Sequence, residues 1–284
     1  MREDRPSSTA QRVAMRRAAH QFLDAPKVFD DPIALRIIGE KSALALQADP
    51  RQSDATPLSS YLRAFVAVRS RYAEDELALA VQRGVRQYVI LGAGLDTFAY
   101  RNPYPEAVLR VFEVDHPATQ AWKRARLEEI GITPPCNLTF APVDFETQTL
   151  EEGLRGAGYD GDKRTFFSWL GVTEYLTSKV VMATLGFIAS APVGSGVVFD
   201  YMISPSLLTP PQRSRFDALA QRVASAGEPW QAFFDPEGLT RDLRVMGFCS
   251  VEDNGPDEIN AKYFKNRSDG LRVGSLSHVM IARV

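Results

Sequence analysis

Short apolar segments alternate with amphipathic segments along most of this chain, and the alternation predicts its fold class. The apolar segments have the length of buried strands, and they are residues 88–91, 110–115, 138–145, 165–170, 196–202, 248–253 and 276–284. Apolar residues recur at helical spacing in the segments between them, at 117–130, 178–191, 211–225 and 235–246. Such alternation is typical of an α/β fold with an open, mostly parallel sheet and helices on both faces.

The part of the chain before the first predicted strand has a different pattern. Residues 11–85 have helical periodicity, which is broken near Pro26, Pro32, Pro50 and Pro57. We expect a disordered stretch over residues 1–10. The sequence therefore predicts an N-terminal tail and helical cap over residues 1–85 and a ligand-binding domain over residues 86–284, joined in one integrated unit.

One predicted helix, over residues 60–83, carries an arginine on its apolar face. Residues at helical spacing define that face, and they are Leu62, Phe65, Val66, Tyr72, Ala73, Leu77 and Val81. Arg69 lies in the middle of the face, whereas Arg63 and Arg71 lie off it. A buried guanidinium needs an anionic partner, because its desolvation otherwise goes uncompensated. The partner is either a carboxylate of the protein or the carboxylate of a bound ligand.

The first predicted strand runs directly into a glycine turn, in the sequence QYVILGAGLDT at residues 87–97. Gly92 and Gly94 allow a sharp turn and a close approach to a ligand, because glycine has no Cβ. The dinucleotide-binding version, G-x-G-x-x-G, has a third glycine where this chain has Thr97. The turn therefore favours a nucleoside ligand without a pyrophosphate, such as S-adenosylmethionine. Its simplest alternative is a tight turn without a ligand.

An acidic residue about 20 positions after such glycines can accept hydrogen bonds from a ribose. Glu113 and Asp115 both lie in that range, in the second predicted strand with the sequence RVFEVD. Pro117 then suits the first turn of a helix.

Four motifs in this order resemble one known family. They are LGAGLDTFAYR, FEVDHP, VDF at residues 143–145 and WLGVTEYL at residues 169–176. Together with the early segment RAAHQFLDAPKVFDDPIALRI, they resemble the leucine carboxyl methyltransferase family, and more closely its bacterial branch of S-adenosylmethionine-dependent methyltransferases. The resemblance covers roughly residues 14–284. It implies a Rossmann-like class I methyltransferase fold, with a seven-stranded, mostly parallel sheet whose last strand is antiparallel.

The resemblance also implies a set of cofactor-binding residues. At the methionine end, the backbone at Gly92 and Gly94 would lie against the cofactor, and Arg69 would contact its carboxylate. For Arg69 this favours the ligand over a protein carboxylate.

At the nucleoside end of the cofactor, Asp115 would accept from the ribose hydroxyls. Asp144 would accept from the adenine amino group, with Phe145 supplying a backbone contact or an apolar wall. The alternative for Asp115 and Asp144 is helix N-capping at strand ends.

The chain departs from the family at one position. Leu170 stands where the family commonly has a glutamate that could contact the cofactor's amino group. Glu174 and Asp96 are the candidates to replace it.

The sequence says less about the methyl acceptor than about the cofactor. We expect a small molecule that is methylated on an oxygen atom, with a carboxyl group as one candidate. A carboxylate acceptor needs no base, because it is already ionised near neutral pH. A phenol or alcohol needs one, and the candidates are His278, Tyr175, Tyr201 and Asp200. For His278 and the two tyrosines we favour packing roles. The segment WQAFF at residues 230–234 either lines a substrate pocket or anchors the following helix.

Composition limits the remaining classes. A net charge of −2 gives no indication of a nucleic-acid or membrane partner. Cys136 and Cys249 have no metal or redox spacing, which fits a cytoplasmic setting, and the three histidines are too scattered for a metal site. Two alternative functions stay open: a nicotinamide-dependent oxidoreductase, which Thr97 disfavours, and a non-catalytic cofactor-binding protein, to which Leu170 gives some weight.

Overall fold

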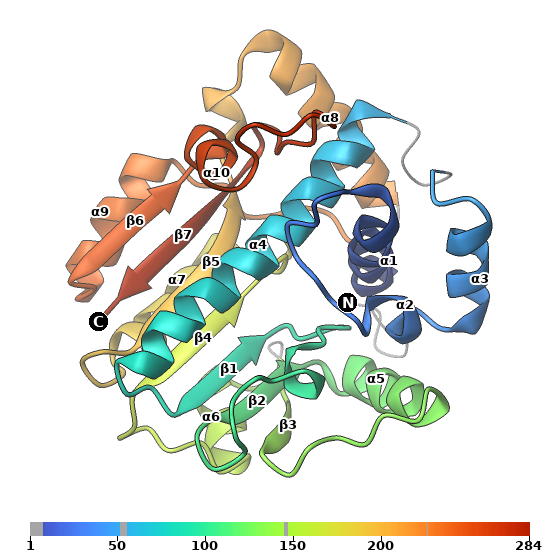
Figure 1. Ribbon diagram of the computed structural model, residues 1–284. Helices are drawn as coiled ribbons and strands as arrows, with labels where there is room; N and C mark the ends of the chain where they lie inside the picture. The colour runs from blue at the N-terminus through green and yellow to red at the C-terminus, as the bar shows by residue number, and fades with distance from the viewer. Residues whose placement is uncertain (1–7, 52–55, 145–146, 226) are drawn as a thin grey trace.

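The computed structural model describes residues 8–51, 56–144, 147–225 and 227–284. Within them, a seven-stranded sheet forms the centre of the molecule, in the order β3-β2-β1-β4-β5-β7-β6 (Figure 1). The strands are β1 (Gln87–Leu91), β2 (Arg110–Asp115), β3 (Leu138–Pro142), β4 (Thr165–Trp169), β5 (Gly196–Met202), β6 (Ser250–Asn254) and β7 (Ser277–Arg283). Neighbours from β3 to β5 pair in parallel, and β7 is antiparallel to both β5 and β6. This confirms the predicted fold class and the antiparallel last strand.

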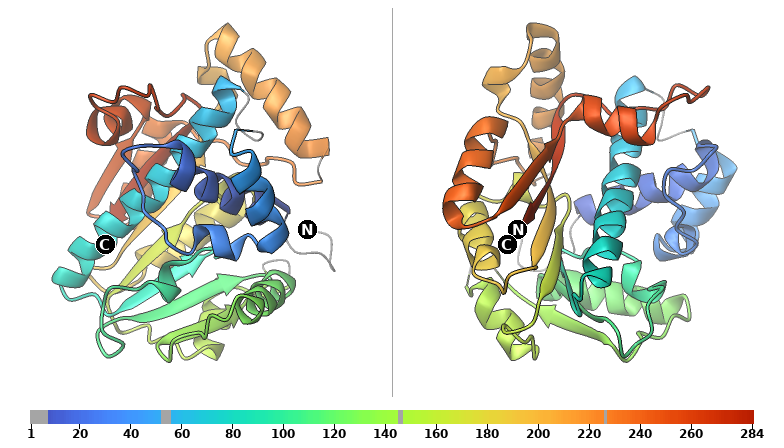
Figure 2. Two further views of the ribbon diagram at one scale, coloured as in Figure 1. Left: turned by 45° about the vertical axis from the view of Figure 1, so that its right-hand side comes forward. Right: turned by 60° about the vertical axis from the view of Figure 1, so that its left-hand side comes forward.

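Helices cover both faces of the sheet (Figure 2). The long helix α4 (Pro57–Gln82) and the short helix α10 (Pro256–Tyr263) share one apolar core with the sheet. On the other face, a second core includes α6 (Leu150–Gly156), α7 (Ser178–Ala189) and α9 (Pro236–Met246). Helix α8 (Pro210–Ser225) lies beyond the carboxyl end of β5, near the start of α4.

Local sequence signals set the ends of these helices. Thr56 caps α4, since its side chain accepts from the Ser59 N–H, and Pro57 occupies the first turn. Asp235 caps α9 in the same way before Pro236. Gly247 ends α9 in the left-handed conformation, with φ 113°, that glycine adopts without a Cβ penalty.

The N-terminal block consists of α1 (Ser8–Leu23), α2 (Ala34–Ile37) and α3 (Glu40–Ala48). Together with α5 (Pro117–Glu129) these helices surround a third apolar core. The prediction of disorder over residues 1–10 is wrong for the last three, because α1 begins at Ser8; the first seven lie outside the described residues. The Ser8 N–H donates to Glu228, 3.2 Å away, so a contact far along the chain stabilises this helix start.

Buried polar contacts tie the N-terminal block to the glycine turn. Asp31 accepts from the Thr97 hydroxyl at 2.7 Å and pairs with Arg17 at 2.8 Å. Thr97, which replaces the third glycine of the dinucleotide motif, therefore anchors the preceding helices.

The sequence predicts that Arg63 lies off the apolar face of α4, and the structure shows that this second side of the helix is buried as well. Arg63 is buried, and its guanidinium makes two hydrogen bonds to the Asp24 carboxylate, at 2.8 and 2.9 Å. The segment after α1 covers this side of α4, which the apolar periodicity of α4 alone does not reveal. Arg71 is exposed, as predicted, and pairs with Asp75.

Candidate functional site

The glycine turn lies where β1 ends, and β1 is the strand at which the sheet order reverses. Gly92 and Gly94 both have positive φ, 64° and 45°. The Gly94 N–H donates to Asp115 Oδ2 at 2.5 Å, and the His116 N–H donates to Asp115 Oδ1 at 2.7 Å. Burial raises the pKa of Asp115 despite these bonds. The structure therefore brings together the glycine turn and the second acidic residue that the sequence singled out.

The other acidic residue of β2 has a different role. Glu113 is fully buried and pairs with Lys123 of α5 at 2.7 Å. Burial raises the pKa of Glu113 to about 7. Of the two acids in the predicted range, only Asp115 contacts the glycine turn among the described residues.

The two glycines also allow close packing of the chain. A Cβ on Gly92 would lie 2.3 Å from Val172 Cγ2, and a Cβ on Gly94 would lie 3.1 Å from the Ala10 Cβ of α1. The turn thus lies against the loop after β4 and against the first helix. Tight packing accounts for part of the need for glycine at both positions.

A cavity of about 280 Å³ lies at the carboxyl ends of β4 and β5. Its charged residues at the sheet are Arg69 of α4, Glu174 after β4 and Asp200 of β5. Its other walls come from α1, from the first half of α4, from α8 and from Trp230.

Arg69 is held by a protein carboxylate. Its Nη1 atom lies 2.7 Å from Asp200 Oδ2, and Asp200 Oδ1 accepts from the Gly171 N–H at 2.6 Å. Asp200 lies 131 residues along the chain from Arg69. A Cβ on Gly171, whose φ is 72°, would lie 2.5 Å from the guanidinium. Because Gly171 has no side chain, the Arg69 guanidinium can lie across the loop after β4.

Glu174 completes the charged cluster. Burial and the neighbouring Asp200 raise the pKa of Glu174 to about 8, although Arg69 opposes the shift. Its Oε2 atom is inaccessible to solvent and has no hydrogen-bond partner among the described residues. Burial thus favours the protonated form of Glu174, and the hydrogen-bonding capacity of its Oε2 atom is unused among the described residues.

We expect Glu174→Gln to flatten part of the dependence of stability on pH. A carboxyl whose pKa is higher in the folded than in the unfolded chain stabilises the fold while protonated, so that stability is lost as pH rises from about 5 to about 9. A shift of the pKa from 4.5 to about 8 corresponds to a loss of up to about 5 kcal/mol, which removing this group should abolish. Urea unfolding at a series of pH values measures it. Glu237→Gln, at an exposed position, is the control, and identical slopes in both variants would contradict the assignment.

Three further residues considered in the sequence analysis, Asp144, Leu170 and Asp96, do not line this cavity. Asp144 follows β3, where its backbone carbonyl accepts from the Thr147 and Gln148 N–H groups. Phe145 lies outside the described residues. Leu170 packs against the core under α4, and Asp96 accepts from the Phe98 N–H at 2.8 Å. Of the two candidates to replace the missing glutamate, Glu174 is the one that lines the cavity.

The family model described as leucine carboxyl methyltransferase matches residues 10–189. The chain belongs to the leucine carboxyl methyltransferase family. It is 34% identical to YktD of Bacillus subtilis (strain 168) over 99% of each chain. The name of that protein describes it as an S-adenosyl-L-methionine-dependent methyltransferase. The protein is therefore an S-adenosylmethionine-dependent methyltransferase, and the predicted cofactor is confirmed.

Solved structures show the same fold in other bacterial proteins. A Thermobifida fusca YX protein described as a methyltransferase has a TM-score of 0.56 at 20% identity, over 95% of this chain and 93% of that one. A DUF574 family protein from Streptomyces avermitilis MA-4680 has a TM-score of 0.51 at 14% identity, over 94% and 96%. At these identities the likeness concerns the fold alone.

In this methyltransferase, three of the four residues predicted as possible bases line the cavity: Tyr175, Asp200 and Tyr201. Burial raises the pKa of Tyr175 to about 12. The Tyr201 hydroxyl lies 2.9 Å from Asp253, and His278 Nδ1 lies 2.7 Å from the same carboxylate. His278 therefore has the packing role that its place on the last strand predicts, and the Tyr201 hydroxyl points to Asp253.

Residues of the WQAFF segment line the cavity and pack against α8 and β5, and the role as an anchor for the following helix stays a prediction. Trp230 lines the cavity of the methyltransferase, whereas Phe233 packs against Phe216 and Phe234 against Tyr201. Three arginines also line the cavity without any sequence pattern that predicts it: Arg12, Arg16 and Arg222. Their position depends on α1 and α8 meeting over the sheet, which no local pattern indicates.

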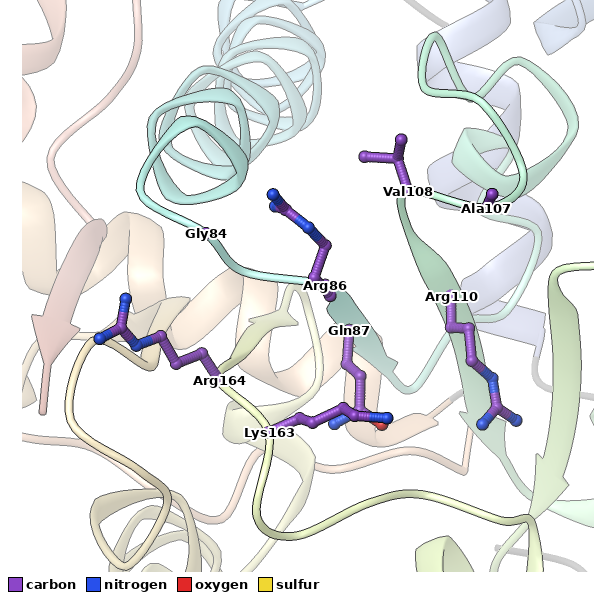
Figure 3. A pocket seen from close by; sticks show the side chains of 8 residues that line it. All are labelled: Gly84, Arg86, Gln87, Ala107, Val108, Arg110, Lys163 and Arg164. Atoms are coloured by element: carbon purple, nitrogen blue, oxygen red, sulfur yellow. The ribbon is translucent and has the colours of Figure 1, made fainter.

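A second cavity, of about 390 Å³, lies at the amino ends of β1, β2 and β4. Arg86, Arg110, Lys163 and Arg164 line it, and Figure 3 shows their side chains diverging. The guanidinium groups of the three arginines donate to backbone carbonyls, including Val81 and Arg83 at the end of α4. These arginines stabilise helix ends, and the cavity lies at the opposite edge of the sheet from the glycine turn.

None of the helices in the described residues is long and apolar enough to cross a membrane. In the same residues, no group of three or more His, Cys, Asp or Glu side chains could hold a metal ion.

Proposed function

We propose that this methyltransferase transfers the methyl group to an oxygen atom of a small-molecule acceptor, most readily to a carboxylate. The charged cluster of Arg69, Asp200 and Glu174 carries this proposal. Asp200 already accepts from Arg69 and Gly171, Glu174 holds its own proton at neutral pH, and the Tyr175 hydroxyl has a raised pKa. An acceptor that is already ionised needs none of these groups as a base, so a carboxylate is favoured over an alcohol or a phenol.

The same cluster fits the amino-acid end of S-adenosylmethionine. Arg69 uses Nη1 for Asp200 and has further N–H donors for the cofactor's carboxylate. The unpaired Glu174 Oε2 could accept from its ammonium group, which supports Glu174 as the replacement for the glutamate missing at Leu170. The bound cofactor supplies an activated methyl group, and the protein orients the acceptor for in-line displacement.

At the nucleoside end, Asp115 is the residue best supported for ribose binding. Its two oxygens accept one backbone N–H each, and a carboxylate has about four acceptor positions, so capacity is left for hydroxyl groups. Gly92 and Gly94 would lie beside the cofactor's methionine part. Asp144, followed by Phe145, stays the proposed partner of the adenine amino group.

We expect Asp115→Ala to weaken binding of S-adenosylhomocysteine more than tenfold, which corresponds to about 1.4 kcal/mol. The change removes both the proposed ribose acceptor and the bond that holds Gly94. Isothermal titration calorimetry of the purified protein measures the affinity. Asp162→Ala, at an exposed position before β4, is the control and should leave it unchanged. Wild-type protein that does not bind S-adenosylhomocysteine up to millimolar concentration would refute the site, and so would unchanged affinity in Asp115→Ala.

A further inference from the structure

The glycine turn after β1 lacks the support that a following α-helix gives in related folds. In dinucleotide-binding folds, the helix after such a turn packs closely against the strand before it. Here residues 92–109, all of which are described, connect β1 to β2, and the one helical segment among them is the short 3-10 turn η1 (Phe98–Tyr100). Support for the turn therefore has to come from other parts of the chain.

The N-terminal block makes two polar contacts with the turn. The Arg17 guanidinium of α1 donates to the backbone carbonyl of Leu95, the residue after the second glycine. Two residues further along, the Thr97 hydroxyl donates to Asp31 Oδ2 at 2.7 Å. The turn is thus held by the N-terminal block as well as by the end of β2.

Asp31 joins these two contacts. Its Oδ2 atom, which accepts from Thr97, also lies 2.8 Å from Arg17 Nε, and its Oδ1 atom accepts from the Ile33 N–H at 3.0 Å. Only 1% of Asp31 and none of Thr97 is exposed. Because both side chains are shielded from solvent, their hydrogen bond is costly to lose, and it fixes the turn relative to the segment after α1.

Arg101 extends the support to α4. Its Nε atom donates to the Thr97 hydroxyl oxygen at 3.1 Å, and its guanidinium makes two hydrogen bonds to the Glu74 carboxylate of α4. The same guanidinium lies over the ring of Phe29, 4.8 Å from the ring centroid. Thr97 is therefore the residue at which the segment after α1 and, through Arg101, helix α4 both attach to the turn.

We propose that Asp31 and Thr97 are positioning residues for the cofactor, and that the bond between them holds the glycine turn in the conformation that binds S-adenosylmethionine. The inference rests on the proposed function, because it takes the glycine turn as the cofactor-binding turn. Neither residue lines the cavity, so both act through the backbone of the turn. A loosened turn lowers the affinity without removing any group that touches the cofactor, since binding then has to order the turn first.

Exchanging Thr97 tests this proposal. Thr97→Val keeps the shape of the side chain and removes the hydroxyl, and we expect it to lower the affinity for S-adenosylhomocysteine by about fivefold or more, measured by isothermal titration calorimetry. Thr97→Ser keeps the hydroxyl and should retain the wild-type affinity. Both variants are first shown to be folded by circular dichroism and urea unfolding.

Thr165→Val is the matched control. Thr165 is also fully buried and hydrogen-bonds to Gln87 and Lys163, but it lies at the amino end of β4, away from the glycine turn. Its replacement should lower the stability and leave the affinity for S-adenosylhomocysteine unchanged. A purely structural role of Thr97 would give the same result, a loss of stability without a loss of affinity.

Hydrogen–deuterium exchange locates the effect. Thr97→Val should speed exchange at the amides of residues 94–98. Adding S-adenosylhomocysteine to the wild-type protein should slow exchange at residues 28–33, which do not line the cavity, because coupling between two sites is reciprocal. Arg17→Gln removes the donor to the Leu95 carbonyl and should likewise lower the affinity and speed exchange in the turn. It tests the proposal on its own if the valine variant does not fold.

Unchanged affinity in Thr97→Val, or equal losses of affinity in Thr97→Val and Thr165→Val, would overturn the proposal. Asp115→Ala, measured beside them, separates two kinds of failure. If Asp115→Ala weakens binding and Thr97→Val does not, the cofactor site stands and the positioning role is wrong. If the wild-type protein itself does not bind S-adenosylhomocysteine, the proposed cofactor site fails, and the positioning role fails with it.

Discussion

Replacing Asp24 with alanine should lower the free energy of unfolding by about 3–5 kcal/mol, the range seen when one partner of a buried ion pair is removed. The Asp24 carboxylate holds Arg63 by two hydrogen bonds and lies 2.6 Å from His20 Nδ1. Only 2% of the Asp24 side chain and 7% of the Arg63 side chain are exposed. Without the carboxylate, the guanidinium stays buried next to an apolar core and has lost the acceptor of two of its hydrogen bonds.

The geometry of His20 adds to the loss. Its Nε2 atom accepts from the Val28 and Phe29 N–H groups at 3.0 and 3.1 Å, so the ring proton is on Nδ1 and is donated to Asp24. Asp24 thus fixes the orientation of a ring that satisfies two backbone groups after α1. We therefore expect the alanine variant to loosen the connection between α1 and α2 as well.

Guanidinium chloride unfolding of the two proteins measures the difference. Asp30→Ala is the control, because Asp30 makes an exposed pair with Lys27 and should contribute less than about 1 kcal/mol. Burial raises the pKa of Asp24, but His20 and Arg63 outweigh it and hold the pKa below its usual range. The contribution is therefore present above the unfolded-state pKa and is lost as pH falls through the folded one. Equal losses for Asp24→Ala and Asp30→Ala would contradict this view of the pair.

The core of the fold could be predicted because its signals are local. Each parallel strand is an apolar run. The spacing of Gly92, Gly94 and Asp115 predicts that Asp115 belongs to the same site as the glycine turn. The helices α6 and α10 were missed, since they have only seven and eight residues and few apolar positions. A signal existed for α6, where Thr149 and Glu152 form a capping box.

The partners of the buried arginines could not be predicted for a physical reason. Helical periodicity identifies the face of α4 that is buried against the sheet, and Arg69 lies on it as predicted. It does not identify a second buried side, which here is covered by the segment that carries Asp24. Helical periodicity also does not show which distant strand supplies the partner carboxylate of Arg69, which here is Asp200 of β5. Long-range contacts of this kind depend on how whole elements meet.

The Arg69–Asp200 pair has two interpretations, and one set of variants separates them. Arg69→Met should lower the affinity for S-adenosylhomocysteine more than tenfold, about 1.4 kcal/mol. It should also destabilise the protein by about 3–5 kcal/mol, because Asp200 and Glu174 then share a buried site without a cation. Arg71→Met, two residues further along α4 at an exposed position, is the control and should change neither property.

Adding Asp200→Asn to Arg69→Met removes the unpaired charge and should recover much of the stability, while the amide can still accept from the Gly171 N–H. If Arg69 binds the cofactor's carboxylate, the affinity for S-adenosylhomocysteine stays low in the double variant, because the guanidinium is still missing. If the affinity returns together with the stability, Arg69 only positions the loop after β4. Comparing unfolding and calorimetry on the same three proteins therefore distinguishes a cofactor-binding arginine from a structural one.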